Sequence, residues 1–420
     1  MSIPRIVVTR VLPPTSQAAL EKLSNVEMVQ WKEDRNMPRD LLLNSIKGAD
    51  GLLCMLTDKV DQELFKVAGP KLKVVSTMSV GFDHVDTAEL KQRGIKLGYT
   101  PDVLTDATAD TTVMLLLAAA RRLKEHQSCG GWRDLNVTCH NYPTQWREWG
   151  PNWLCAFCLM ATVSRHIFSQ SNFIPGVQFT SKTLGVVGLG RIGEAVAHRL
   201  RAFGISRVLY SGRGTKHEAA ARLGGALHVP FHGLLAKSDF IVVCCALTEE
   251  TKGMFNYDAF RRMKSSAVGS GRNRWWMVLG GEIGEGSYVM GAVGIFVNTA
   301  RGGHVVQDDL ARALQENLIA AAGLDVTTPE PLPTDSPLLG FKNCIVVPHI
   351  GELSHKARMF VILSNIVDLN ISVSFLFCFS AVSSCAIGSA TTETRDEMGH
   401  MAVANLLAGL KGETLPHAPF

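Results

Sequence analysis

The sequence predicts an α/β protein built from two doubly wound parallel-sheet domains. The first hundred residues alternate strand-like and helix-like segments, as chains do when helices cover both faces of a parallel sheet. Residues 184–193 (LGVVGLGRIG) begin a second such unit with an apolar strand and a glycine-rich turn. A chain of 420 residues also has room for two or three domains.

Short apolar runs predict the elements of the first unit. Strands are expected at 6–10, 26–31, 51–56, 73–81 and 95–100, with helices near 16–24, 38–47 and 61–68. A long apolar helix follows over 105–126, with its N-cap at Thr105 or Asp106 and basic residues at its end.

The second unit continues beyond the glycine-rich turn. A helix is expected over 194–204, and strands at 207–213, 240–248, 296–303, 323–327 and 344–351. We therefore expect a Rossmann domain over 107–349. It is inserted into a flavodoxin-like domain formed by 1–106 and 350–420. The substrate should bind in the cleft between the two.

Each of the three glycines in the turn has its own physical reason. Gly188 allows the tight turn, Gly190 lets the backbone approach a pyrophosphate, and Gly193 lets helix and strand pack closely. The helix that follows Arg191 and Ile192 of the turn offers N–H groups and a positive dipole end to the phosphates. The flanking strand and helix favour a dinucleotide site over a purely structural glycine turn.

The end of the next strand indicates which dinucleotide binds. NAD-specific sites usually carry Asp or Glu there, bound to the ribose 2′-hydroxyl. This chain has Ser211, Gly212 and Arg213, with Lys216 nearby. Such residues can bind a 2′-phosphate, which a carboxylate would repel. We expect NADP(H) to be preferred, with NAD(H) as the alternative; an ordinary basic loop is the plainer interpretation.

Composition argues against several other classes of protein. The net charge is +4 with mixed signs and no basic block, which gives nucleic-acid binding no support. The N-terminal residues lack the features of a signal peptide, so we expect a cytoplasmic protein with no membrane partner. Ten cysteines in so long a chain do not form a disulfide framework. Cys155 and Cys158 form a CxxC near Cys139-His140, but a second pair at suitable spacing is missing, so no metal is expected.

Several motifs together carry a family resemblance. GLGRIG, VNTARGG, GLDVTTPEPLP and VVPHIG resemble the D-isomer-specific 2-hydroxyacid dehydrogenases. Within that family, STMSVGFDHVD, LGYTPDVLTD, WREWGPNWLC and NLLAGLKGE are similar to the glyoxylate and hydroxypyruvate reductases. The resemblance covers most of the chain. It implies an NAD(P)-dependent oxidoreductase of small 2-keto or 2-hydroxy acids that works as a homodimer.

The resemblance also implies three catalytic residues at strand ends. Arg301 would fork onto the carboxylate and carbonyl oxygens of the substrate, and His349 would donate a proton to the developing alkoxide. Glu330 would hydrogen-bond His349 and favour its imidazolium form near neutral pH. The plainer alternatives are a loop salt bridge for Arg301, a polar loop residue for His349 and a solvated carboxylate for Glu330.

Further contact positions follow from the same resemblance. Backbone N–H groups around Val80 and Gly81 would bind the substrate carboxylate, and Trp149 would reach the neighbouring subunit's active site. The remaining substrate and cofactor contacts are expected from Asp325, Ala246, Thr299 and Gly351. Where relatives have Asp after Arg-Gly, this chain has Gly303-His304.

Four stretches break the family pattern: roughly 133–146, much of 156–181, 269–295 and 352–388. Removing them restores the expected order and spacing of motifs. We interpret them as translated introns, with genuine insertions as the alternative. The last contains ISVSFLFCFSAVSS, which is long enough to suggest a membrane helix. A span placed directly after His349 would tear the predicted site apart.

The function expected from these observations is reduction of glyoxylate to glycolate and of hydroxypyruvate to D-glycerate, with NADPH preferred. A 3-phosphoglycerate dehydrogenase-like enzyme would favour an acid after Tyr210 and basic residues near Val80. A dinucleotide-sensing corepressor would normally add an N-terminal extension and a disordered tail. A third alternative is an inactive splice product of the same fold.

Overall fold

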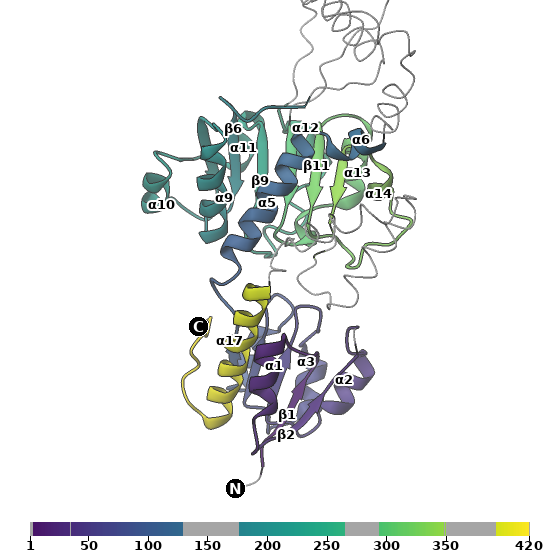
Figure 1. The fold of residues 1–420 in the computed structure, drawn as a ribbon, viewed down its shortest axis with the longest axis vertical. Coiled ribbons are helices and arrows are strands. Elements are labelled where there is room, and N and C mark those ends of the chain that lie inside the picture. Colours follow the sequence, from purple (N-terminus) through teal and green to yellow (C-terminus); the bar gives the residue numbers. More distant parts are fainter. Residues whose placement is uncertain are drawn as a thin grey trace, which may run out of the picture.

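The computed structural model places two parallel β-sheets in two separate layered units (Figure 1). It describes residues 3–33, 35–128, 176–264, 294–347, 349 and 392–419. Helices flank both sheets. Among the described residues, paired strands run parallel to each other. The predicted fold class, two doubly wound parallel-sheet domains, is confirmed.

The first sheet has five strands in the order β2-β1-β3-β4-β5. This is the flavodoxin-like order, in which the chain starts in the interior of the sheet and then reverses direction. The strands are β1 (Arg5–Val8), β2 (Glu27–Gln30), β3 (Gly51–Cys54), β4 (Val74–Thr77) and β5 (Lys96–Gly98). All residues of β3 and β4 are buried, because helices cover both faces of the sheet there.

The last helix of the chain packs on this first sheet. The helices of the unit are α1 (Pro14–Glu21), α2 (Arg39–Ser45), α3 (Gln62–Ala68), α4 (Thr87–Gln92) and α17 (Thr392–Lys411). In Figure 1 the yellow α17 lies beside the purple α1. The Ser76 hydroxyl of β4 donates to the Ala402 carbonyl of α17 at 2.8 Å. Both ends of the chain therefore build one unit.

The second sheet has seven strands in the order β12-β11-β10-β9-β6-β7-β8. The strands are β6 (Thr183–Val187), β7 (Arg207–Ser211), β8 (Leu227–His228), β9 (Phe240–Val243), β10 (Ile295–Asn298), β11 (Ala321–Leu324) and β12 (Cys344–Val346). Strand order reverses between β6 and β9, as in a Rossmann fold. Ligands of such sheets bind in the crevice outside the carboxyl ends of the strands at that point.

Two apolar clusters hold helices to the faces of this sheet. The helical segments are α5 (Thr105–Ala120), α6 (Leu123–Ser128), α9 (Arg191–Ala202), α10 (His217–Arg222), α11 (Phe231–Lys237), α12 (Tyr257–Arg262), η3 (Gly302–His304), α13 (Gln307–Gln315) and α14 (Pro337–Gly340). One cluster seats α5 and α9, and the other seats α11, α12 and α13. In the second cluster the Phe296 ring of β10 lies 4.7 Å from the Phe255 ring.

The predicted single helix over 105–126 is wrong, because the structure divides it into α5 and α6. Arg122 has a φ of 55°, which ends the first helix. Its guanidinium contacts Glu125 of α6, with Nη2 donating to Oε1 at 2.7 Å. The predicted N-cap is also wrong, since Leu104 occupies that position without a side-chain cap. Burial of the helix against the sheet supplies the stability that a cap would have added.

Two ends of the predicted non-native stretches belong to the fold. Phe179 is buried and its ring stacks on Phe240 at 4.6 Å between centroids. The Val177 N–H donates to the Ala120 carbonyl at 2.8 Å, so residues 176–181 form part of the described fold. Ile295 likewise opens β10, in register with Phe240. Residues 133–146, 156–175, 269–293 and 352–388 of the four stretches lie outside the described residues.

Candidate active site

The glycine-rich turn between β6 and α9 has the geometry that the sequence predicts. Gly188 has a φ of +95°, and a methyl group there would lie 2.7 Å from the Cys245 backbone nitrogen. A methyl group on Gly193 would overlap the Gly188 carbonyl oxygen. Gly190, by contrast, has no atom within 4 Å of its missing Cβ. Two glycines thus pack the turn, and the third faces open space where a pyrophosphate fits.

The loop after β7 presents hydroxyl and basic side chains rather than a carboxylate. Ser211 ends the strand half-buried, and Arg213 and Lys216 are exposed. The Ser211 carbonyl accepts from Gly188 N–H at 2.8 Å, so this loop lies next to the glycine turn. The Tyr210 hydroxyl accepts from the Lys216 N–H at 2.9 Å, which ties the loop to β7.

A cavity of about 430 Å³ lies between the two sheets at the carboxyl ends of their strands. Residues of both units line it. Among the residues predicted from sequence, the lining includes Val80, Gly81, Ile192, Ala246, Thr299, Arg301, Asp325 and His349. Positions more than two hundred residues apart in the chain thus share one cavity. Trp149 and Gly351, also predicted for this site, lie outside the described residues.

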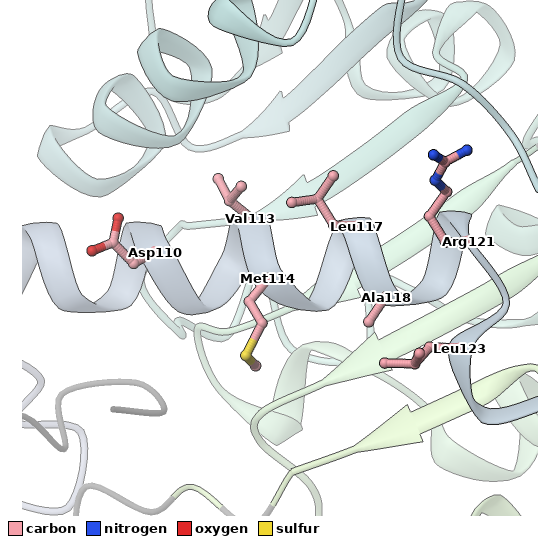
Figure 2. Close-up of a pocket in the computed structure, with 7 residues that line it drawn as sticks. All are labelled: Asp110, Val113, Met114, Leu117, Ala118, Arg121 and Leu123. Atoms are coloured by element: carbon pink, nitrogen blue, oxygen red, sulfur yellow. The ribbon is translucent and has the colours of Figure 1, made fainter. Parts of the chain in front are cut away.

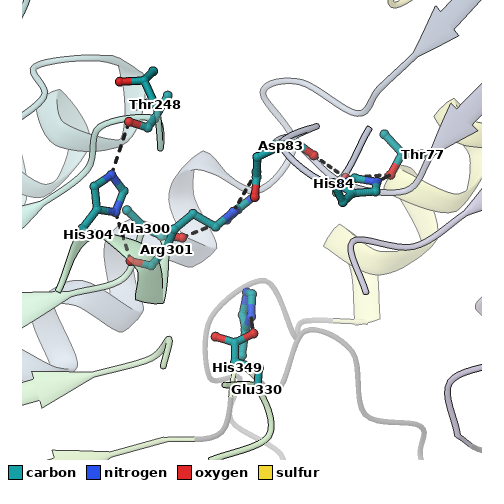
Figure 3. A network of polar contacts seen from close by, with 12 residues as sticks. Thr77, Asp83, His84, Thr248, Ala300, Arg301, His304, Glu330 and His349 are labelled. Carbon is teal, nitrogen blue, oxygen red and sulfur yellow. Dashed lines mark hydrogen bonds and ion pairs between the residues drawn. The ribbon is translucent and has the colours of Figure 1, made fainter. Parts of the chain in front are cut away.

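His349 and Glu330 form a pair at one side of the cavity (Figure 3). His349 Nδ1 lies 3.0 Å from Glu330 Oε2. The other carboxylate oxygen of Glu330 accepts from the Thr327 N–H at 2.9 Å, which holds the side chain in place. Burial alone would raise the pKa of Glu330, but the hydrogen bond and charge of His349 lower it below its usual value. Glu330 is therefore an anion facing the imidazole.

Arg301 follows β10, and side-chain contacts to its backbone carbonyl fix its position. Its carbonyl oxygen accepts from the Asn298 side-chain amide at 2.8 Å and lies 3.0 Å from His304 Nδ1. Its Nε donates to Asp83 Oδ1 at 3.1 Å (Figure 3). Asp83 and Asn298 could not be predicted from the sequence, since neither stands out by charge pattern or period, and His304 stood out only as a departure from the relatives.

Asp325 is a buried acid at the end of β11, 4% exposed. Within the described part of the chain, its Oδ1 has no hydrogen-bond partner. Burial raises the pKa of Asp325 to about 6, with the Glu330 charge adding to the rise and His349 opposing it. An unpartnered polar atom on the cavity wall fits a ligand that supplies a hydrogen-bond donor.

The predictions about Arg191, a metal site and a membrane helix concern regions away from the catalytic pair. The Arg191 guanidinium, predicted to contact the cofactor, pairs with Asp102 in the segment between β5 and α5. Across the described ranges, no group of three His, Cys, Asp or Glu side chains could hold a metal. Cys139, His140, Cys155 and Cys158 lie outside those ranges. No helix among the described residues is long and apolar enough to cross a membrane.

The fold and the cavity define a dinucleotide-dependent oxidoreductase. A doubly wound sheet with a glycine turn at its switch point provides the dinucleotide site. Arg301 and His349 line the same cavity from different strand ends, and Glu330 contacts His349.

Comparison with known proteins defines the family. A model of the D-isomer specific 2-hydroxyacid dehydrogenase catalytic domain matches residues 6–418. The chain is 40% identical over 415 residues to the glyoxylate reductase/hydroxypyruvate reductase of Homo sapiens, covering 98% of this chain and 96% of that protein. It is 36% identical over 358 residues to the glyoxylate reductase of Thermococcus kodakarensis, covering 84% and 89%. This chain belongs to the D-isomer specific 2-hydroxyacid dehydrogenase family, as its motifs predicted.

A solved structure gives the same result for the fold. The TT0316 protein from Thermus thermophilus superposes with a TM-score of 0.67 at 31% identity, covering 99% of this chain and 100% of that one. The chain is thus an enzyme of the D-2-hydroxyacid dehydrogenase type, and its relatives include reductases of small keto acids.

Proposed function

We propose that this enzyme reduces glyoxylate to glycolate and hydroxypyruvate to D-glycerate, with NADPH as the preferred cofactor. The observation that carries the proposal is the His349–Glu330 pair, which shares one cavity with Arg301 and the Val80–Gly81 loop. The similarity to reductases with these names supports the choice of substrates.

Each of the chain's own residues has a distinct task in this reaction. The reduced nicotinamide, when bound, supplies the hydride to the keto carbon. Arg301 and the N–H groups of the Val80–Gly81 loop hold the substrate carboxylate. His349 donates the proton from Nε2 to the keto oxygen, and solvent returns a proton to the imidazole afterwards. Glu330 stabilises the charged imidazole and fixes its orientation through Nδ1.

The cofactor preference rests on the loop after β7. Ser211, Arg213 and Lys216 offer donors and positive charge at the place where NAD-specific enzymes carry an acid. Their exposure leaves them accessible to a 2′-phosphate. The open space at Gly190 and the unpartnered Asp325 Oδ1 support dinucleotide binding in general, without distinguishing NADP(H) from NAD(H).

We also propose that the enzyme is a homodimer joined through the outer face of α5 (Figure 2). A shallow apolar surface there is lined by Val113, Met114, Leu117, Ala118 and Leu123. Asp110 and Arg121 lie at its opposite ends. Asp110 pairs with Arg199 of α9 at 2.7 Å, and an antiparallel two-fold contact would bring it also toward Arg121 of the other copy. A second copy of this chain thus has both the apolar and the charge pattern that this surface requires.

Sedimentation of charged variants tests the dimer. Leu117→Arg places a charge at the centre of the surface and should give a monomer. Leu227→Arg is the matched control, because Leu227 of β8 is already 54% exposed. A dimer that survives Leu117→Arg would exclude α5 as the contact.

The proposed reaction is tested by following NADPH oxidation with each keto acid. Glyoxylate and hydroxypyruvate should both be reduced, and an Arg301→Ala variant should lose activity with both. If wild-type protein binds NADPH but reduces neither acid, the substrate assignment is wrong.

A further inference from the structure

An ion pair crosses the cavity between the two sheets. Asp83 follows β4 of the first sheet, whereas Arg301 follows β10 of the second. The Arg301 Nε donates to Asp83 Oδ1 at 3.1 Å, and the two side chains are only 23% and 33% exposed. Both residues line the cavity (Figure 3). The pair therefore connects the two units at the substrate site itself.

The guanidinium of Arg301 is constrained on several sides. Its Nη1 donates to the Ala300 carbonyl at 2.8 Å. Its Nη2 lies so close to Gly81 that a methyl group there would overlap it, and the same methyl would lie 2.9 Å from Asp83 Oδ1. The Arg fork has five N–H donors, and the bonds to Asp83 and Ala300 use two of them. The Nη2 end is thereby directed at the Val80–Gly81 loop.

Asp83 is itself on a firmly held loop. The Ser79 hydroxyl donates to the Gly81 carbonyl at 2.6 Å, and it lies 2.8 Å from the Thr77 hydroxyl. The Thr77 hydroxyl lies 3.0 Å from His84 Nε2. Burial lowers the pKa of His84 to about 4, so this neighbour is neutral at pH 7. Arg301 is thus the cation that Asp83 faces across the cavity.

We propose that Asp83 is a positioning residue for substrate reduction. It holds the Arg301 guanidinium against the Val80–Gly81 loop, so that both halves of the carboxylate site keep one geometry although they come from different domains. The inference rests on the proposed function, in which Arg301 and this loop bind the substrate carboxylate. A displaced guanidinium would leave the keto carbon misaligned with the hydride donor, and a misplacement of about 1 Å can cost about 100-fold in rate.

Two substitutions in the full chain test this role. Asp83→Ala removes the acceptor for the Arg301 Nε–H, and kcat with hydroxypyruvate should fall about 100-fold. Asp83→Asn keeps an oxygen acceptor in the same place and should retain kcat to within about tenfold. The KM for NADPH should be unchanged in both, because the pair lies at the carboxylate site. A purely structural tie between the domains would instead lower the melting temperature of Asp83→Ala and leave its kcat unchanged.

Asp106→Ala is the matched control. Asp106 of α5 pairs with Arg199 of α9 at 2.7 Å, away from the cavity. Its kcat should equal that of the wild type. If Asp83→Ala also keeps wild-type kcat, or if Asn and Ala fall equally, the positioning role of Asp83 is overturned.

A second measurement does not depend on catalysis. The Nε–H resonance of Arg301, assigned by its loss in Arg301→Lys, should be protected from solvent exchange in the wild type and in Asp83→Asn. The protection should be lost in Asp83→Ala. If wild-type protein reduces no 2-keto acid, the proposed function fails, and this measurement still decides whether Asp83 holds Arg301. Protection that persists in Asp83→Ala refutes that hold while leaving the proposed function intact.

Discussion

His349 Nδ1 and Glu330 Oε2 lie 3.0 Å apart at the wall of the cavity between the two sheets. The two residues come from different strand ends, after β12 and β11 respectively. This contact orients the imidazole through Nδ1, and it gives the pair a testable pH dependence.

Removing the imidazole should abolish most of the reductase activity. General acid catalysis contributes roughly 10²–10⁴-fold, so His349→Ala should lower kcat by that range. His198→Ala, which changes an exposed histidine of α9, is the control and should have no effect.

Removing only the charge of Glu330 should shift the pH–rate profile. Glu330→Gln keeps a hydrogen-bond acceptor but no longer favours the imidazolium, so the apparent pKa of the catalytic acid should fall. Activity would then be lost at a lower pH than in the wild type. An unshifted kcat/KM profile would mean that the Glu330 charge does not act on His349.

The cofactor preference should reverse when the charge after β7 is reversed. Arg213→Asp places a carboxylate where the 2′-phosphate is expected, so the KM for NADPH should rise and that for NADH should fall. Arg207→Asp makes the same change at the other end of β7 and serves as the control. Equal use of both cofactors by the wild type would contradict the proposed preference.

Two glycines of the same turn should respond differently to alanine. Gly190→Ala adds a methyl group in open space, so it should weaken NADPH binding without lowering the melting temperature of the free protein. Gly193→Ala forces a methyl group onto the Gly188 carbonyl and should lower the melting temperature. Thermal unfolding with and without NADPH separates the two effects. A destabilised Gly190→Ala would show that this position is packed.

The buried Asp325 should make stability depend on pH. Because its pKa is raised to about 6, the folded protein binds this proton more tightly than the unfolded chain does. Stability is therefore fully present below about pH 4 and falls by up to about 3 kcal/mol as the pH rises to about 6. Asp325→Asn should lack this loss. Its melting temperature should therefore rise relative to that of the wild type as the pH increases over this range. A constant difference between the two proteins would refute the raised pKa.

The interrupting stretches should be dispensable. A variant lacking 133–146, 156–175, 269–293 and 352–388 should be soluble, dimeric and active, because the described residues already complete both sheets and the cavity. The full chain should be less soluble or less active, since apolar runs such as that within 352–388 favour association when exposed. Comparable kcat/KM for hydroxypyruvate in the two proteins would show that the stretches are tolerated insertions.

Elements whose form depends on local backbone chemistry could be predicted from the residues alone. Strand β6, the turn at Gly188 to Gly193 and helix α9 follow from an apolar run and three glycines with separate steric reasons. The proposed catalytic residues Arg301, Glu330 and His349 could be predicted for another reason, since they stand in family motifs. The helix break at Arg122 was not, because it depends on the chain returning at Val177 to the last turn of α5.

The way in which the two units share a site follows from how they pack together in space. Asp83 and Arg301 are separated by 218 positions, and each belongs to a different sheet. Likewise, α17 packs beside β4 although more than three hundred residues separate them. Such contacts leave no period in the sequence, because the docking of whole sheets and helices fixes them. The apolar and polar pattern of each segment specifies its own face and not its partner.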